Sequence, residues 1–230
     1  GLRQGWSVKT EGQAKVYEAQ RQHMVDHQLR ARGVHDERVL AAFAKVPREE
    51  FVPEDLRPAA YEDRALPIGY GQTISQPYMV AVMLEMLDVH SDHTVLEVGA
   101  GSGYQAALLS LLAKQVYAIE IIEPLAHRAR ATLAALGYTN VTVLCADGTL
   151  GYEPGAPYDR IIVAAACPEL PPPLVAQLKE GGRIVAPVGR RGVQECVVGV
   201  KRGEELEITK TLGCVFVPLV GAYGWKRRAW

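Results

Sequence analysis

The sequence predicts an α/β fold: a doubly wound, mostly parallel sheet with helices on both faces, preceded by N-terminal helices and followed by an antiparallel C-terminal edge. Near-continuous apolar runs alternate with helix-forming segments between residues 95 and 188, which is typical of parallel strands buried on both sides. The first run, Val95–Val98, leads through a glycine-rich loop into the helix formers of Gln105–Ala113. After residue 195, strand-like segments are separated by glycine turns, which predicts the antiparallel edge.

The length and composition predict one domain. The 230 residues, 48% of them hydrophobic, can bury a full core. We divide the chain into an arm at residues 1–12, a region of helices and one long loop at 13–90, the α/β core at 91–220 and a tail at 221–230. The arm is polar and contains glycine, so we expect it to be loosely ordered.

The net charge, the hydropathy and the spacing of the cysteines argue against several classes of protein. The formal net charge of -1 and the lack of a long basic run argue against nucleic-acid binding, and we interpret Lys226–Arg228 as a solvated tail. No apolar run approaches the roughly 20 residues of a membrane span, and the first residues lack the apolar segment of a signal peptide. The cysteines are widely spaced, which indicates reduced core residues of a cytoplasmic protein: Cys145, Cys167, Cys196 and Cys214.

The N-terminal region is expected to hold three helices and a long loop. An amphipathic pattern predicts a helix over residues 14–32 that ends at Gly33, and a second helix over residues 36–44. Residues 49–72 contain three prolines and two glycines, so we expect irregular structure there, and a loop this long is usually functional. A third helix is expected from Pro77 to Leu87, with Ser75 or Gln76 at its cap.

His23 and His27 are spaced as a helical metal-binding pair would be. Met24 stands where a zincin motif has its glutamate, and no third ligand is evident. We therefore expect no metal site.

The core is expected to contain five strands and two further helices. The strands are predicted at residues 95–98, 116–120, 141–146, 160–165 and 183–188. The helices are predicted at residues 123–136 and 170–179, each closed by glycine. Three more strands are predicted for the edge, at residues 196–200, 205–212 and 214–219.

The glycine loop and three acidic residues at strand ends predict a nucleoside site. In an open α/β sheet the ligand lies beyond the carboxyl ends of the strands. Three acidic residues fall at or next to such ends: Glu97, Glu120 and Asp147. A carboxylate in this place can accept hydrogen bonds from both hydroxyl groups of a ribose. Carboxylates also cap helices, so each alone is ambiguous. The loop reads G-x-G-x-G, one residue short of the dinucleotide fingerprint, which favours a nucleoside without a pyrophosphate.

Several motifs resemble a known family. Val95–Ala107 resembles motif I of the class I, Rossmann-like methyltransferases. The motif itself begins at the acidic residue Glu97, where other members can carry Asp. Leu66–Ala81 resembles the signature of the protein-L-isoaspartate O-methyltransferase family, and its part Gly71–Pro77 makes the match specific. Three further segments match in the expected order, so that the resemblance covers about residues 16–219: Pro157–Val163, Leu178–Arg183 and Phe216–Leu219.

This resemblance implies a reaction and a site. The implied reaction is methyl transfer from S-adenosyl-L-methionine, leaving S-adenosyl-L-homocysteine, to the free α-carboxylate of L-isoaspartyl residues in damaged proteins and peptides, which starts repair through a succinimide. We further expect the protein to be cytoplasmic, as its cysteine usage indicates, and monomeric. Its implied cofactor-binding residues are Thr73, Ile74, Glu97, Gly99, Gly101, Gly103, Glu120, Ile121, Asp147 and Gly148. Ser75 would face the reacting carboxylate as the catalytic residue.

Several alternatives stay open at this point. The acceptor could be another carboxylate, the chain could be a cofactor-binding adaptor without turnover, and an oxidoreductase using NAD is a more distant reading. Ser75 could act only as a helix cap. Tyr70, Tyr78 and Tyr104 could line the site, although packing is the commoner role of such residues.

Overall fold

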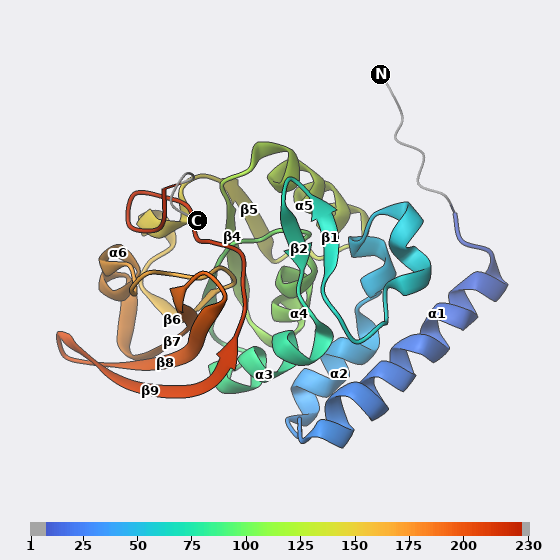
Figure 1. The fold of residues 1–230 in the computed structure, drawn as a ribbon, viewed down its shortest axis with the longest axis horizontal. Coiled ribbons are helices and arrows are strands. Elements are labelled where there is room, and N and C mark those ends of the chain that lie inside the picture. Colours follow the sequence, from blue (N-terminus) through green and yellow to red (C-terminus); the bar gives the residue numbers. More distant parts are fainter. Residues whose placement is uncertain (1–7, 227–230) are drawn as a thin grey trace.

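A seven-stranded sheet forms the centre of the computed structural model, which describes residues 8–226 (Figure 1). The strand order is β5-β4-β3-β6-β7-β8-β9. Strands β3 to β7 pair in parallel, and β8 and β9 are antiparallel additions, as predicted. The strands are β3 (Thr94–Val98), β4 (Gln115–Glu120), β5 (Val141–Cys145), β6 (Tyr158–Val163), β7 (Leu178–Arg190), β8 (Val193–Arg202) and β9 (Glu205–Cys214).

Helices cover both faces of the sheet, but unevenly. One face carries α3 (Pro77–Leu87), α4 (Tyr104–Leu112) and α5 (Glu123–Ala135) together with the N-terminal helices, and the other carries α6 (Pro172–Ala176) and two short 3₁₀ turns. Alternate residues of each strand enter the two cores: Val95 joins the first and Leu96 the second. Both faces are therefore apolar, which explains why the strands read as continuous hydrophobic runs.

The N-terminal helices follow the predicted pattern, with one difference at the start. Helix α1 (Glu11–His23) continues through a π-helical turn (Met24–Leu29) and a 3₁₀ turn to Gly33, whose φ of 96° ends it. The prediction of a loose arm to residue 12 is wrong at its end, because Thr10 and Gln13 form a capping box that starts the helix at Glu11. Residues 1–7 of the arm lie outside the described residues.

Helix α2 (Glu37–Lys45) is capped by Asp36, which accepts hydrogen bonds from two backbone amides of the first turn, and it matches the second predicted helix. Among residues 8–226, no helix is both long and apolar enough to cross a membrane.

The long loop contains a β-hairpin that its composition did not predict. Strands β1 (Leu66–Gly69) and β2 (Gln72–Ile74) pair antiparallel around a turn in which Tyr70 has a φ of 57°. The proline and glycines that argue against a strand lie at a bulge and at the turn, where they are tolerated. Two 3₁₀ helices, Arg48–Phe51 and Glu54–Ala59, occupy the preceding residues.

Two predicted elements near the C-terminal half are wrong in extent or type. The helix predicted for residues 170–179 shrinks to α6, because Tyr158 already pairs with Gln177 and Leu178 enters β7. The strand predicted for residues 214–219 does not form; the chain there crosses above the sheet, with a single bridge between Ala166 and Pro218. Of the tail, residues 221–226 are described and residues 227–230 are not.

The cysteines follow the sequence interpretation at three of the four positions. All four cysteines are free thiols; Cys145 is exposed, contrary to a core role, whereas the other three are buried. Within residues 8–226 no group of three or more His, Cys, Asp or Glu side chains is arranged to hold a metal ion, and the rings of His23 and His27 lie 4.3 Å apart.

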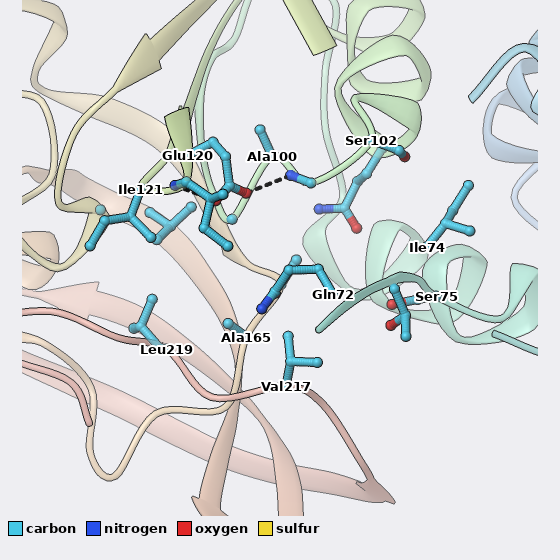
Figure 2. A pocket seen from close by; sticks show the side chains of 18 of the residues that line it. Gln72, Ile74, Ser75, Ala100, Ser102, Glu120, Ile121, Ala165, Val217 and Leu219 are labelled. Carbon is cyan, nitrogen blue, oxygen red and sulfur yellow. Dashed lines mark hydrogen bonds between the residues drawn. The ribbon is translucent and has the colours of Figure 1, made fainter. Parts of the chain in front are cut away.

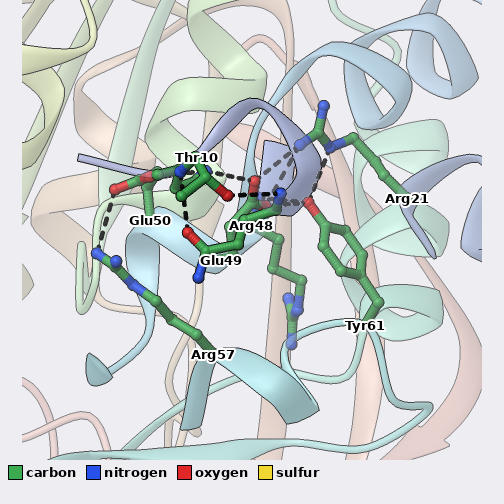
Figure 3. Close-up of polar contacts among 9 residues, drawn as sticks. Thr10, Arg21, Arg48, Glu49, Glu50, Arg57 and Tyr61 are labelled. Atoms are coloured by element: carbon green, nitrogen blue, oxygen red, sulfur yellow. Dashed lines mark hydrogen bonds and ion pairs between the residues drawn. The ribbon is translucent and has the colours of Figure 1, made fainter. Parts of the chain in front are cut away.

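A buried ionic cluster fastens α1 to the loop region (Figure 3). The Glu49 carboxylate, 1% exposed, accepts hydrogen bonds from Lys9 (2.7 Å) and Arg21 (2.9 Å) and from the hydroxyl of Tyr61. Burial alone would raise the pKa of Glu49, but these donors hold it below the usual value. The cluster therefore stabilises the fold in the ionised form of Glu49.

Replacing Glu49 should destabilise the protein strongly. We expect Glu49→Gln to lower the free energy of unfolding by about 3 kcal/mol at neutral pH, because Arg21 loses its buried partner. The difference should shrink as the pH falls through the lowered pKa of Glu49, since the wild type then also loses the charge. Urea unfolding between pH 3 and 8 measures both effects. The exposed pair of Arg30 and Glu37 supplies the control, and Glu37→Gln should leave the free energy of unfolding nearly unchanged, because water screens this pair.

Candidate active site

A cavity of about 540 Å³ lies above the carboxyl ends of β3, β4 and β6, where the strand order reverses. Figure 2 shows Gln72, Ile74 and Ser75 on one side of it and Val217 and Leu219 on another. Its volume falls within the range of about 300–1,000 Å³ that is usual for small-molecule sites. Most of the predicted site residues meet here.

The three glycines of the loop have different roles. Gly99 (φ 92°) and Gly101 (φ 53°) line the cavity and need the left-handed conformation. Gly103 does not line it. A Cβ at Gly103 would lie 3.3 Å from the Cβ of Ala129, so this glycine allows α4 to pack closely against α5. The structure thus places Gly103 away from the predicted ligand contact.

Glu120 organises the loop from the end of β4. Its Oε1 accepts a hydrogen bond from the amide of Gly101 (2.8 Å), and its Oε2 accepts one from the amide of Ile122 (3.0 Å). The carboxylate is only 6% exposed and lines the cavity beside Ile121. Each oxygen keeps a lone pair for a further donor, which suits two hydroxyl groups of a ligand.

Glu97 lies beneath the cavity rather than on its wall. The side chain is fully buried, and neither oxygen has a hydrogen-bond partner within residues 8–226. Burial raises the pKa of Glu97 to about 8; the charge of Glu120 adds to this shift and the nearby amide of Gln105 opposes it. Glu97 is therefore largely protonated at neutral pH in this structure.

Asp147 and Gly148 separate in the structure. Gly148 lines the cavity, and a Cβ there would lie 2.5 Å from Val98, so only glycine fits. Asp147 does not line it: Oδ1 accepts hydrogen bonds from the amide and hydroxyl of Thr149, and Oδ2 accepts one from the amide of Ala222. Asp147 thus anchors the C-terminal segment, a role that its position after β5 did not reveal.

Thr73, Ile74 and Ser75 reach the cavity from β2, as expected. The alternative of Ser75 as a helix cap is not supported, because Gln76 occupies the N-cap position of α3 and makes no side-chain capping bond. The carbonyl of Ser75 accepts a hydrogen bond from Arg48 (2.9 Å). Of the three tyrosines considered, Tyr70 and Tyr104 line the cavity, whereas Tyr78 packs against Arg32.

The sequence interpretation missed about half of the cavity wall. The missed residues include Gln72, Ser102, Gln105, Ala164, Ala165 and Val217–Val220. Ala164 and Ala165 follow β6, the strand on the other side of the switch point, so the strand-end rule could have identified them. The family-like segment Phe216–Leu219 did not show that Val217–Val220 reach the cavity, since their position depends on a long-range bridge.

A second cavity of about 810 Å³ meets the first. Both are lined by Thr73, Ser75 and Pro218, and the second also contacts Asp63, Arg64 and Arg191. Ser75 therefore stands, with Thr73 and Pro218, at the junction between a nucleoside-sized cavity and a cleft that charged side chains line.

The sheet order and the glycine loop at its switch point define a class I methyltransferase fold. The sequence model of the protein-L-isoaspartate(D-aspartate) O-methyltransferase family matches residues 19–224, and the chain belongs to this family. A protein-L-isoaspartate O-methyltransferase from Methanoculleus marisnigri is 56% identical over 90% of this chain and 94% of its own. One from Syntrophus aciditrophicus is 50% identical over 91% of this chain and 97% of its own.

Solved structures agree with the fold. A protein-L-isoaspartate O-methyltransferase superposes with a TM-score of 0.80 at 31% identity, covering 89% of this chain and 67% of that chain. A Plasmodium falciparum protein, solved in complex with S-adenosyl-L-homocysteine, superposes with a TM-score of 0.76 at 22% identity, covering 89% of this chain and 98% of its own. The second likeness concerns the fold alone.

Replacing Glu97 should remove a pH dependence of stability. Because the folded pKa is about 8 and the unfolded value is ordinary, the stabilisation from the neutral form is complete below about pH 4.5 and is lost as the pH rises through 8. The free energy of unfolding of the wild type, relative to Glu97→Gln, should fall by up to about 1.4 kcal/mol per pH unit in this window. Urea unfolding from pH 5 to 8.5 measures it. A difference in the free energy of unfolding between the two proteins that does not change with pH would contradict the raised pKa of Glu97.

Proposed function

We infer that this protein transfers a methyl group from S-adenosyl-L-methionine to the free α-carboxylate of L-isoaspartyl residues in damaged proteins and peptides. The resulting ester closes to a succinimide, whose hydrolysis restores some normal aspartate. Family membership supports this reaction. The observation that carries it in the structure is the meeting of a nucleoside-sized cavity and a polar cleft at Ser75.

The residues on the first cavity fit S-adenosyl-L-methionine. Glu120, already held by two amides, would accept hydrogen bonds from the ribose hydroxyls beside Ile121, and the amides around Gly99 and Gly101 would approach the ligand closely. Thr73 and Ile74 would cover the methionine part. The amide Nε2 of Gln105, which lines the cavity, is buried without a hydrogen-bond partner within residues 8–226, as expected next to a ligand with polar atoms. Gly148 would lie near the adenine.

The site needs few catalytic groups. When bound, the cofactor supplies a methyl group on a positively charged sulfonium. The acceptor carboxylate has an ordinary pKa of about 4 and is already ionised at neutral pH, so this chain needs no general base. Ser75 would orient the carboxylate oxygen by donating a hydrogen bond, and the apolar walls would exclude water. Such positioning can contribute up to about 7–11 kcal/mol.

We propose that the second cavity holds the isoaspartyl segment and that the chain acts as a single-domain cytoplasmic monomer. The near-neutral net charge supports proteins and peptides, rather than nucleic acid or membranes, as its partners. The four free thiols support a reducing compartment.

A paired assay tests the function. Two hexapeptides that differ only in Asp or L-isoAsp are incubated with labelled methyl donor, and methanol released from the base-labile ester is captured. We expect label only on the L-isoAsp peptide. Equal labelling of both would indicate another carboxylate acceptor, and raised thermal stability with S-adenosyl-L-homocysteine but no labelled product would indicate an adaptor.

Ser75→Ala should affect turnover rather than stability. Because Ser75 does not cap α3, the free energy of unfolding should change by less than about 0.5 kcal/mol. Loss of a hydrogen bond to a charged acceptor should lower kcat/KM for the L-isoAsp peptide about 10- to 100-fold. Steady-state kinetics and urea unfolding check the two parts. Unchanged kcat/KM would exclude Ser75 from the reaction.

Glu120→Gln should weaken cofactor binding. The amide presents one acceptor oxygen instead of two, so either the loop amides or the ribose hydroxyls lose a partner. We expect the Kd of S-adenosyl-L-homocysteine, measured by calorimetry, to rise about 10-fold or more. Glu123→Gln, an exposed change in the first turn of α5, is the matched control and should leave the Kd within twofold.

A further inference from the structure

Arg48 is the largest fully buried side chain of the described chain, and it belongs to neither cavity. It is 0% exposed, yet within residues 8–226 no carboxylate forms an ion pair with it. In Figure 3 its guanidinium extends away from Glu49, which instead binds Lys9, Arg21 and Tyr61. Although burial lowers the pKa of Arg48, a guanidinium stays charged at neutral pH.

The guanidinium joins two distant points of the backbone. Its Nε donates to the carbonyl of Ala60 (2.7 Å), and its Nη2 donates to the carbonyl of Ser75 (2.9 Å). Residues 60 and 75 are the two ends of the segment that contains the β1–β2 hairpin. Arg48 therefore closes this segment into a loop at its base.

The same guanidinium also contacts the helix that follows the glycine loop. Its central carbon lies 4.9 Å from the ring centroid of Tyr104, the first residue of α4, in a cation–π arrangement. Tyr104 is 1% exposed and lines the cavity. Arg48 thus links the base of the hairpin to the element that carries the other wall.

Burying this charge is unfavourable for stability alone. An unpaired buried cation costs several kcal/mol of desolvation, and an apolar side chain of similar volume is often at least as stabilising. What an apolar residue cannot provide is a planar fork that fixes two carbonyl groups at a set separation. The hairpin so fixed supplies Gln72, Thr73, Ile74 and Ser75 to the cavity wall.

We propose that Arg48 is a positioning residue that holds both ends of residues 60–75 against α4 and thereby places Ser75 at the junction of the two cavities. This proposal rests on the proposed methyltransferase function. Arg48 lines neither cavity, and it acts through the backbone of Ser75.

The test combines kinetics with hydrogen exchange. In Arg48→Met, at a temperature where circular dichroism shows the protein folded, we expect kcat/KM for the L-isoAsp hexapeptide to fall at least 10-fold. The backbone amides of residues 72–75 should exchange at least 10-fold faster. In the Ser75→Ala background the kinetic loss from Arg48→Met should be less than threefold, because Arg48 acts by placing the Ser75 hydroxyl, which this background lacks.

Two further variants sharpen the test. Arg160 provides the matched control, since its guanidinium also donates to backbone carbonyls, those of Leu87, Asp88 and Asp159, but lines neither cavity. Arg160→Met should leave kcat/KM and the exchange of residues 72–75 within twofold of wild type. Arg48→Lys keeps the charge but not the planar fork of donors. The amides of residues 72–75 should exchange in this variant at a rate between those of wild type and Arg48→Met. Arg48→Lys replaces Arg48→Met in the test if the latter does not fold.

The outcomes separate the two proposals. If the wild-type protein never methylates the L-isoAsp peptide, the proposed methyltransferase function is overturned. Faster amide exchange of residues 72–75 in Arg48→Met would still support the positioning role of Arg48. An active wild type with Arg48 variants that match it in kcat/KM and exchange overturns the positioning role. Fully additive losses in the double variant would also overturn it, because Arg48 would then not act through Ser75.

Discussion

The parallel pairing of β3 with both β4 and β6 is the constraint on which the site depends. Because β3 lies between them, the chain leaves the sheet in opposite directions on its two sides, and a crevice opens above its carboxyl end. The glycine loop, Glu120 and Ala164 come to this crevice from three separate strands. The hydrogen bond from Gly101 to Glu120 then joins the loop to the neighbouring strand.

The cavity becomes enclosed only through segments outside the parallel core. The β1–β2 hairpin folds over it from the N-terminal side, held by Arg48 at its base and by Arg128, which donates to the carbonyl of Ile68 (2.8 Å). Residues 217–220 cross it from the other side, next to the segment that Asp147 anchors. Three long-range polar contacts thus set the shape of a site whose floor is made by strand ends.

Two fully buried ionisable side chains without an ion-pair partner in the described part of the chain lie close to the site. Glu97 and Arg48 are each fully buried without an ion-pair partner among residues 8–226. Glu97 lies on β3 and Arg48 contacts α4, and both of these elements contribute residues to the cavity wall. Glu49, by contrast, is buried with a full set of donors. A buried ionisable side chain that loses its water without gaining a charged partner lowers stability. Such side chains are expected where a site must be held ready for a ligand.

The sequence by itself determined the parallel core, the order of its strands and helices, and the residues that end its strands, because hydrophobic period and glycine position are local signals. It therefore placed Gly99, Gly101 and Glu120 correctly on the cavity. Only the tertiary structure decided that Gly103 packs on Ala129, that Asp147 holds Ala222 and that Arg48 holds Ser75. Each of these contacts joins residues 26 or more positions apart, and no local pattern encodes the partner of such a contact.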